Sequence, residues 1–177
     1  MFIKDYHYPL HNIDMRKDFR ELISETVKSY PDKESFMEKI DGKYKGITFT
    51  EFEKKVKYLG EGLLQKGLPQ REKIAIIGKN CQNWAISYLG ITTSNYIIVP
   101  IDKELKELEI STILSKSGAI AVLCDNKNLD ILEKIQEKNS NLKTIITFFP
   151  NNKNLDTVEG LIELGRKSFE SGKTIYD

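Results

Sequence analysis

Residues 73–80, KIAIIGKN, decide the fold of this chain, because four apolar residues stand in a row before a glycine. A strand with apolar side chains on both faces is typical of a parallel sheet that helices cover on both sides. More short apolar runs follow, each separated from the next by a segment with helical periodicity. The pattern predicts strands at Lys73–Ile77, Tyr96–Val99, Ala119–Leu123 and Lys143–Phe148. It predicts helices at 81–94, 104–117, 127–138 and near Val158–Glu170, with right-handed crossovers.

The sequence before this region predicts a helix and a hairpin. Apolar residues at helical spacing predict a helix from about Met15 to Tyr30, with Asp14 as its N-cap. Ser35–Ile40 and Ile47–Phe49 predict two strands joined at Asp41-Gly42. We expect this hairpin to lie at the edge of a sheet.

A further helix follows the hairpin. Thr50-Glu51-Phe52-Glu53 matches a capping box, in which the Thr50 hydroxyl and the Glu53 carboxylate satisfy amides of the first turn. The whole pattern predicts an α/β fold: a mostly parallel sheet with helices on both faces, plus an N-terminal edge hairpin. We expect residues 1–14 to be a lead-in and residues 15–177 to form one α/β subdomain.

The composition indicates a globular protein and argues against several partners. Of 177 residues, 40% are hydrophobic, and 27 basic residues nearly cancel 26 acidic ones, for a net charge of +1. This balance indicates no nucleic-acid or membrane surface, and no apolar run is long enough for a transmembrane helix. Cys81 and Cys124 stand far apart in apolar settings. We therefore expect reduced thiols in a cytoplasmic protein without a secretory signal.

Three glycine-containing stretches invite a nucleotide site, and none completes a motif. Gly172-Lys173-Thr174 has the second half of a P-loop, but Lys167 stands where the first glycine is needed. Gly78-Lys79 follows a predicted strand, but Asn80 comes next. Gly60 and Gly62 give half of a dinucleotide fingerprint inside a predicted helix.

Polar clusters also have structural explanations. His7 and His11 have the spacing of helical metal ligands, but the lead-in offers no third ligand. Asp102, Glu104 and Glu107 stand near a predicted helix start, where negative charge complements the helix dipole. No G-x-S-x-G nucleophile elbow occurs.

Three single residues near the predicted strand ends are candidates for a functional role. Asn80 follows a strand at the edge where open sheets bind ligands, but an N-cap of the next helix is the favoured interpretation. Trp84 is interpreted as a core anchor, and Pro100 as the end of a strand. We therefore assign no catalytic, cofactor-binding or metal-binding residue.

Three boxes together resemble the AMP-forming acyl-CoA synthetases, a family that includes luciferases and peptide-synthetase adenylation domains. They are residues 47–52 (ITFTEF), residues 74–80 (IAIIGKN) with Trp84, and residues 89–102 (LGITTSNYIIVPID). The resemblance covers roughly residues 16–148. It departs where the family has Gly-Asp before the second box, here Gln70-Arg71-Glu72, and Ala-Gly inside the third, here Ser94-Asn95.

This resemblance implies a fold and a reaction. The chain looks like the first subdomain of the large domain of an adenylate-forming enzyme. Its hairpin turn (41–46) and residues 99–105 are most similar to the bacterial long-chain fatty-acid branch. Such enzymes activate a carboxylic acid with Mg-ATP as an acyl-adenylate and transfer the acyl group to coenzyme A. The family's Ser/Thr/Gly-rich loop ending in lysine has no match in these residues.

We therefore expect an N-terminal portion of a synthetase that is inactive alone. ATP, magnesium and coenzyme A are implied for the parent enzyme, whose remaining chain would be the partner of these residues. A possible dimer would cover exposed apolar surface. The alternative is a self-contained, non-catalytic flavodoxin-like domain, which should expose no large apolar patch. A carrier protein in place of coenzyme A remains a third possibility.

Overall fold

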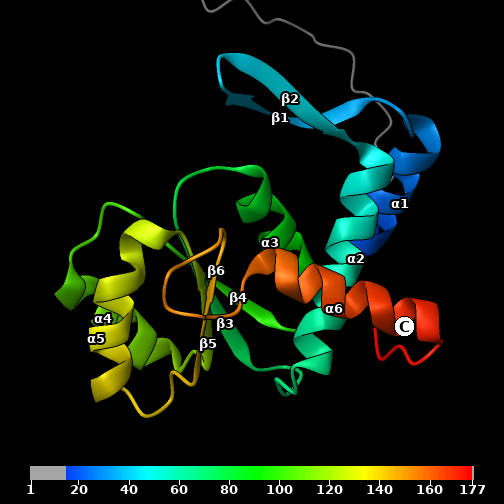
Figure 1. Cartoon of the computed structure of the whole chain (residues 1–177). Helices are drawn as coiled ribbons and strands as arrows, with labels where there is room; N and C mark the ends of the chain where they lie inside the picture. The colour runs from blue at the N-terminus through cyan, green and yellow to red at the C-terminus, as the bar shows by residue number, and fades with distance from the viewer. Residues whose placement is uncertain (1–14, 177) are drawn as a thin grey trace, which may run out of the picture.

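The computed structural model describes residues 15–176 of the chain (Figure 1). The predicted lead-in, with His7, His11 and Asp14, lies outside the described residues. The helices are α1 (Phe19–Ser29), α2 (Phe49–Gln65), α3 (Gln82–Thr93), α4 (Glu107–Ser117), α5 (Leu129–Lys138) and α6 (Val158–Ser171). The strands are β1 (Glu34–Ile40), β2 (Lys43–Thr48), β3 (Lys73–Ile77), β4 (Ile97–Ile101), β5 (Ala121–Cys124) and β6 (Thr144–Thr147), and a short 3-10 helix η1 (Asn126–Asn128) precedes α5.

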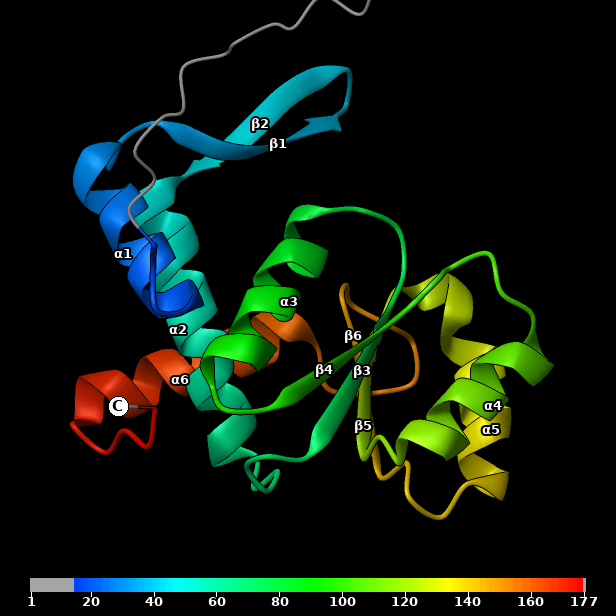
Figure 2. The ribbon, with the colours of Figure 1, turned by 180° about the vertical axis from the view of Figure 1, so that it is seen from behind.

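The predicted parallel sheet is confirmed. Its four strands have the order β4-β3-β5-β6, and every neighbouring pair is parallel. At the centre, Ala75 of β3 lies opposite Val99 of β4 and Val122 of β5. Figures 1 and 2 show α3, α2 and α6 on one side of this sheet and α4 and α5 on the other.

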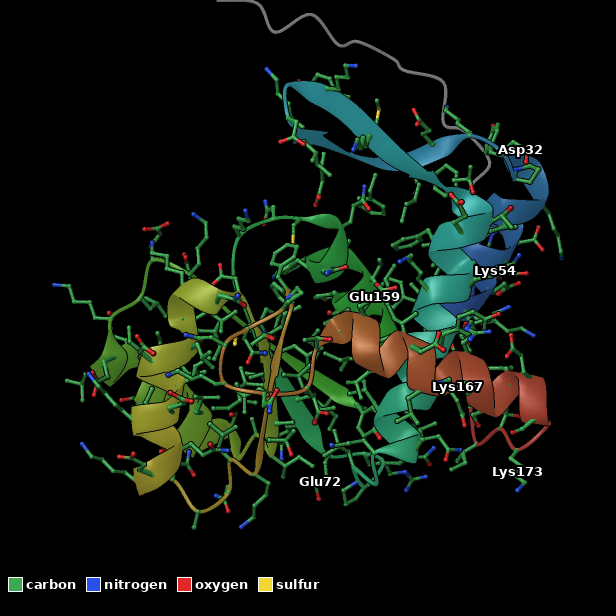
Figure 3. All side chains as sticks on the ribbon, viewed as in Figure 1. Asp32, Lys54, Glu72, Glu159, Lys167 and Lys173 are labelled. Atoms are coloured by element: carbon green, nitrogen blue, oxygen red, sulfur yellow. The ribbon has the colours of Figure 1, made fainter. Side chains whose placement is uncertain are left out.

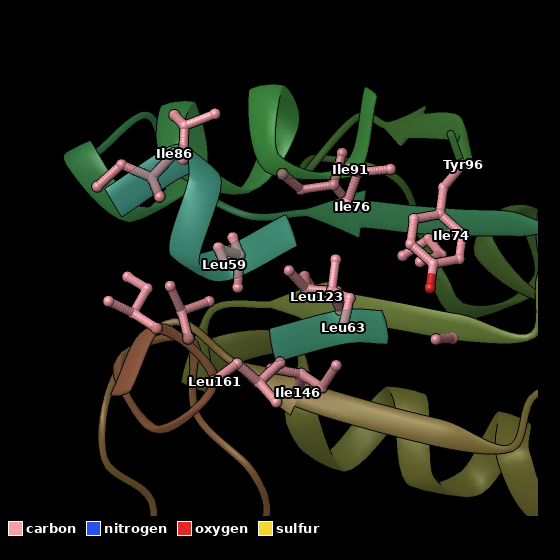
Figure 4. Packing of buried hydrophobic residues seen from close by; sticks show 14 of the residues in the cluster. Leu59, Leu63, Ile74, Ile76, Ile86, Ile91, Tyr96, Leu123, Ile146 and Leu161 are labelled. Atoms are coloured by element: carbon pink, nitrogen blue, oxygen red, sulfur yellow. The ribbon is translucent and has the colours of Figure 1, made fainter. Parts of the chain in front are cut away.

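The alternation of side chains along β3 divides the core into two layers. Ile74 and Ile76 belong to the cluster that packs against α2, α3 and α6 (Figure 4). Ala75 and Ile77 point the other way and pack with Ile110, Leu114 and Leu132 of α4 and α5. Successive side chains of a strand face opposite sides, so a continuous apolar run is what a sheet covered twice requires.

Pro100 lies within a strand, so the prediction that it ends one is wrong. β4 runs from Ile97 to Ile101, and Pro100 pairs with Ile76 of β3. β4 is at the edge of the sheet. An edge strand tolerates proline because one side of its backbone needs no ladder partner.

The hairpin is confirmed, but its predicted place at the edge of the main sheet is wrong. β1 and β2 pair only with each other, as a separate antiparallel sheet. Positive φ angles at Asp41 and Gly42 make the predicted turn. Figure 1 shows the hairpin projecting from the N-terminal end of α2, away from the parallel sheet. The Gln82 amide of α3 donates to Phe36 O and Lys45 O, at 3.1 and 3.2 Å.

Both predicted N-caps in this region need correction. α1 begins at Phe19, and the Asp18 carboxylate accepts from Glu21 N at 2.9 Å. α2 begins at Phe49, and its capping box joins Thr48 to Glu51. The capping-box pattern can begin at Thr48 or at Thr50. The structure uses Thr48, because Thr50 bonds instead to Pro31 O through both its amide and its hydroxyl.

Glycines in α2 and α6 allow the two helices to pack with their backbones close together. A Cβ added to Gly62 would lie 2.1 Å from Leu161 O, and one added to Gly165 would lie 1.9 Å from Tyr58 O. Gly60 likewise faces Ser94 and the Tyr176 ring. The half-fingerprint Gly60-x-Gly62 is therefore explained as a helix-packing feature.

Candidate functional site

The carboxyl ends of β3, β5 and β6 meet at one edge of the sheet, where ligands of open α/β sheets usually bind. Asp125 follows β5 there and is nearly buried. Its Oδ2 accepts from Lys79 N at 3.0 Å, and its Oδ1 accepts from the side-chain amide of Asn128 at 2.7 Å. Its own amide donates to Ile77 O at 3.2 Å. Asp125 therefore fastens the loops after β3 and β5 to each other.

Gly78 makes this fastening possible. Its φ of 156° ends β3, and a Cβ there would lie 2.7 Å from the Phe148 ring and 3.1 Å from Asp125 N. The following Lys79 places its ammonium 5.7 Å from the Phe149 ring centroid. The stretch Gly78-Lys79 thus contacts the loops that follow β5 and β6.

The first turn of α3 is the element that would cradle a phosphate in a nucleotide-binding fold. Its amides have partners within the chain. Gln82 N donates to the Glu38 carboxylate of the hairpin, and Trp84 N lies 3.4 Å from Cys81 Sγ. In the loop before the helix, Lys79 N donates to Asp125, so two carboxylates already accept from amides at and just before this helix start. The residues at this helix start therefore do not fit a triphosphate.

Asn80 is not the N-cap of α3, so the favoured interpretation of that residue is wrong. The cap is Cys81, and Asn80 is exposed one residue earlier. The hydrogen bond from Gln82 N to Glu38 starts the helix after Cys81, and no local pattern in the sequence could have indicated this contact between distant residues.

A hollow of about 420 Å³ opens between the hairpin and the start of α3. Its walls include Asn80, Trp84 and Met37. Trp84 is half-buried, packs against the main core as predicted, and stacks on Tyr88 with ring centroids 5.3 Å apart. Asn80 and Trp84, which both belong to the second family-like box, thus line the same hollow.

Neither cysteine has the environment of a nucleophile. Burial raises the pKa of the Cys81 thiol, and it raises that of Cys124 to about 12. Both thiols are free. They therefore stay protonated at neutral pH, and only a thiolate is reactive.

The carboxylates before α4 are engaged in turn and cap contacts. Asp102 Oδ1 accepts from Glu104 N at 2.9 Å, and Glu104 pairs with Lys103 at 2.6 Å. Of the three predicted carboxylates, Glu107 alone lies in the first turn of α4, where Glu109 is also found, so the dipole explanation holds for Glu107 and not for Asp102 and Glu104. Pairing with Lys103 lowers the pKa of Glu104, which suits a permanently charged surface group.

Gly172-Lys173-Thr174 ends a helix, as expected. Gly172 has a φ of 68° and forms the C-cap of α6, and Lys173 N donates to Ser168 O at 3.2 Å. Within residues 15–176, no group of three or more histidine, cysteine, aspartate or glutamate side chains could hold a metal ion. No helix in that range is long and apolar enough to cross a membrane. The assignment of no site residue stays a prediction.

One buried acid was missed by the sequence reasoning. Glu61 lies in the middle of α2 and is completely buried against α6 and the C-terminal residues. The available signal was a charged residue between Gly60 and Gly62 beside an apolar helix face. Such a residue is more often solvated, so the pattern alone did not single it out.

Comparison with known proteins gives a consistent result. A family described as AMP-binding enzyme matches residues 23–166. Long-chain-fatty-acid–CoA ligase 5 of Rattus norvegicus is 30% identical over 112 residues, 60% of this chain and 16% of the relative. The long-chain-fatty-acid–CoA ligase of Salmonella typhimurium is 26% identical over 140 residues, 77% of this chain and 24% of the relative.

The fold has matching solved structures. A long-chain-fatty-acid-CoA ligase from Archaeoglobus fulgidus superposes with a TM-score of 0.72 at 15% identity, over 89% of this chain and 30% of that one. At this identity the likeness shows the fold alone. The chain spans less than a quarter of the length of the two curated relatives and less than a third of the solved ligase.

Proposed function

Because the chain belongs to the AMP-binding enzyme family, we propose that it supplies the N-terminal α/β portion of an AMP-forming acyl-CoA synthetase. The parent enzyme would activate a carboxylic acid with ATP and transfer the acyl group to coenzyme A. The names of the relatives support a long-chain fatty acid as the substrate. The flavodoxin-like alternative is not favoured, because the family match covers residues 23–166.

The observation that carries this proposal is the first turn of α3. Two carboxylates, Glu38 and Asp125, accept hydrogen bonds from Gln82 N in this turn and from Lys79 N in the loop just before it. A triphosphate brought there would meet like charge and occupied donors, which is unfavourable. We infer that ATP and magnesium are held by residues outside this sequence and that these 177 residues serve as scaffold.

Pyrophosphate exchange tests the proposal. The purified 177-residue chain, given ATP, magnesium and long-chain fatty acids, should show no exchange above background. A longer polypeptide that also contains the Ser/Thr/Gly-rich loop and the remaining chain of the parent enzyme should restore exchange with fatty acids. Exchange by the 177-residue chain itself would overturn the scaffold role, and a longer chain inactive on every acid would overturn the synthetase role.

The hairpin is the surface that we propose for contact with the remaining polypeptide. Met37 and Tyr44 are 54% and 69% exposed, and two strands without a covering layer are marginally stable in water. The rest of the parent chain would cover them. Light scattering on the 177-residue chain provides a test: self-association should weaken in the double variant Met37→Ser, Tyr44→Ser. Self-association that is unchanged would place the contact elsewhere.

We propose a cytoplasmic location for the protein because of the state of its two cysteines. The two cysteines are unpaired, which suits a reducing compartment. Alkylation of both thiols in unfolded protein taken directly from cells would support this, and a mixed disulfide there would contradict it.

A further inference from the structure

Glu61 is a fully buried carboxylate whose hydrogen-bond partners are all uncharged. Its Oε1 lies 2.7 Å from Gln65 Nε2 and 2.7 Å from Ser168 Oγ. Its Oε2 accepts from the backbone amides of Ile175 and Tyr176, both at 2.9 Å. A buried charge is costly unless several donors satisfy it, and here donors from α2, α6 and the residues after α6 do so.

The residues after α6 form a short strap, defined here as residues 173–176 (KTIY). The left-handed Gly172 turns the chain back, so that the strap runs beside α2. The labelled Lys173 side chain points outward in Figure 3 and is exposed, whereas its carbonyl lies 2.7 Å from Ser168 Oγ. The strap is thus held by its backbone, and the acceptor that holds it is mostly Glu61.

The far end of the strap is anchored by an aromatic ring. Tyr176 is only 5% exposed, and the Arg20 guanidinium lies 4.3 Å from its ring centroid. Arg20 also donates to Tyr176 O at 2.9 Å and to Thr93 O at 2.7 Å. These contacts connect α1 and α3 to the strap, so the four residues close the space between three helices.

Two hollows share this closing wall. One, of about 320 Å³, lies between α1 and α2 and includes Val56, and the other, of about 500 Å³, lies beside α3 and includes Gln70. Arg20, Thr93 and Tyr176 line both. The strap residue Tyr176 therefore forms part of the wall of both hollows, and its release would widen both.

We propose that Glu61 is the clip of a releasable strap, which closes over the space between α1, α2 and α3 while the carboxylate is bound to the strap amides. Release opens residues 173–176 as a unit and leaves the parallel sheet folded, because no strap residue pairs with a strand and Tyr176 is the one strap residue in the buried core. Burial raises the pKa of Glu61, but the four hydrogen bonds together lower it further, so the clip is charged at neutral pH. This device is independent of the synthetase proposal.

The substitution Glu61→Gln tests the clip in the 177-residue chain. Glutamine keeps the shape but removes the negative charge, and with its oxygen toward the strap amides its NH2 group meets the donors Gln65 and Ser168, so the hydrogen bonds to the strap weaken. Amide hydrogen exchange should become at least tenfold faster at Ile175 and Tyr176, while β3 and β5 keep the wild-type rates. The control Glu163→Gln neutralises an exposed acid on α6 and should change neither.

Two results would overturn the proposal. The first is strap exchange within twofold of wild type in Glu61→Gln, which would leave Arg20 and the Tyr176 ring as the real anchor. The second is faster exchange of the strap and the sheet together, which would make the strap part of the global fold. Should Glu61→Gln not fold, Gln65→Ala provides the test, since it removes one donor to Glu61 and one donor to the Lys173 carbonyl of the strap: exchange at Ile175 must then rise with the sheet unchanged.

Discussion

The hairpin and the parallel sheet are built from similar residues, but the structure treats them differently. Ile76 of β3 is completely buried, whereas Ile40 of β1 is 40% exposed. β3 has strands on both sides and helices on both faces, whereas β1 has one partner and no covering layer. The comparison shows that strand stability here comes from what covers the strand, since the strand propensity of isoleucine is the same in both.

The hairpin contacts the rest of the chain at few points. The Phe36 ring lies 4.7 Å from the Phe52 ring of α2, and Gln82 of α3 bonds to the hairpin backbone. The hairpin should therefore open before the sheet does, because local opening requires the loss of few contacts.

The largest expected difference in stability is between isoleucine-to-alanine substitutions in β3 and in β1. Ile76→Ala should destabilise the domain by about 4 kcal/mol, because it leaves a cavity in a close-packed layer. Ile40→Ala should cost less than about 1 kcal/mol, since water already contacts much of that side chain. Chemical denaturation of the two variants measures both values, and equal losses would break the comparison.

A second pair of variants tests the layer that covers the sheet. Gly165→Ala should cost about 3 kcal/mol, because its Cβ would press on the Tyr58 carbonyl, a backbone atom of α2. Gly160→Ala in the same helix meets only the Thr157 hydroxyl, at 3.2 Å, and should change stability by less than about 1 kcal/mol. Melting temperatures give the ranking, and a tolerated Gly165→Ala would mean that α6 can move away.

Alkaline pH tests the burial of Tyr96, which precedes β4. Burial raises the pKa of its phenol to about 12, and its hydroxyl donates to Leu68 O at 2.7 Å. The folded state therefore favours the neutral phenol. The resulting contribution to the free energy of unfolding is on the order of 2–3 kcal/mol; it is complete below the unfolded pKa near 10 and is lost as pH rises through about 12.

Tyr96→Phe provides the control, because it cannot ionise. The stability difference between wild type and Tyr96→Phe should shrink between pH 10 and 12 in parallel denaturation series, while lysine titration affects both proteins alike. A constant difference over that range would mean that Tyr96 ionises with an ordinary pKa.

The smallest effect concerns the junction of hairpin and α2. Thr48→Ala removes the observed N-cap and should cost about 1 kcal/mol. Thr50→Ala loses only an exposed bond to Pro31 O and should stay within about 0.5 kcal/mol. A larger loss of stability for Thr50→Ala than for Thr48→Ala in urea denaturation would instead support Thr50 as the N-cap, as the sequence pattern predicted.

Predictions from the sequence succeeded where the signal was local or periodic. The KIAII run required a doubly covered parallel strand, and the helices predicted at 104–117 and near Val158–Glu170 end at Ser117 and Ser171, each followed by a left-handed glycine. Errors arose where two local solutions were nearly equal. Thr48 and Thr50 both offered a cap, and so did Asn80 and Cys81. Distant partners decided between them: Pro31 in the first case, Glu38 in the second.

The candidate site was predictable only in part. The sequence lacks the residues that each phosphate motif requires, but the carboxylates that bond to amides at and just before the start of α3 come from positions 125 and 38, far away in the sequence. Glu61 was missed for the same reason, since its partners lie more than 100 residues later, apart from Gln65.

The sequence by itself determined the elements, their parallel order and the two-sided burial of the sheet, because side-chain periodicity and glycine conformations act within a few residues. Only the tertiary structure decided that the hairpin stands apart, that Pro100 sits inside an edge strand, and that Glu61 is buried. These outcomes depend on contacts between segments that lie far apart in the sequence, and no local pattern indicates which segments meet.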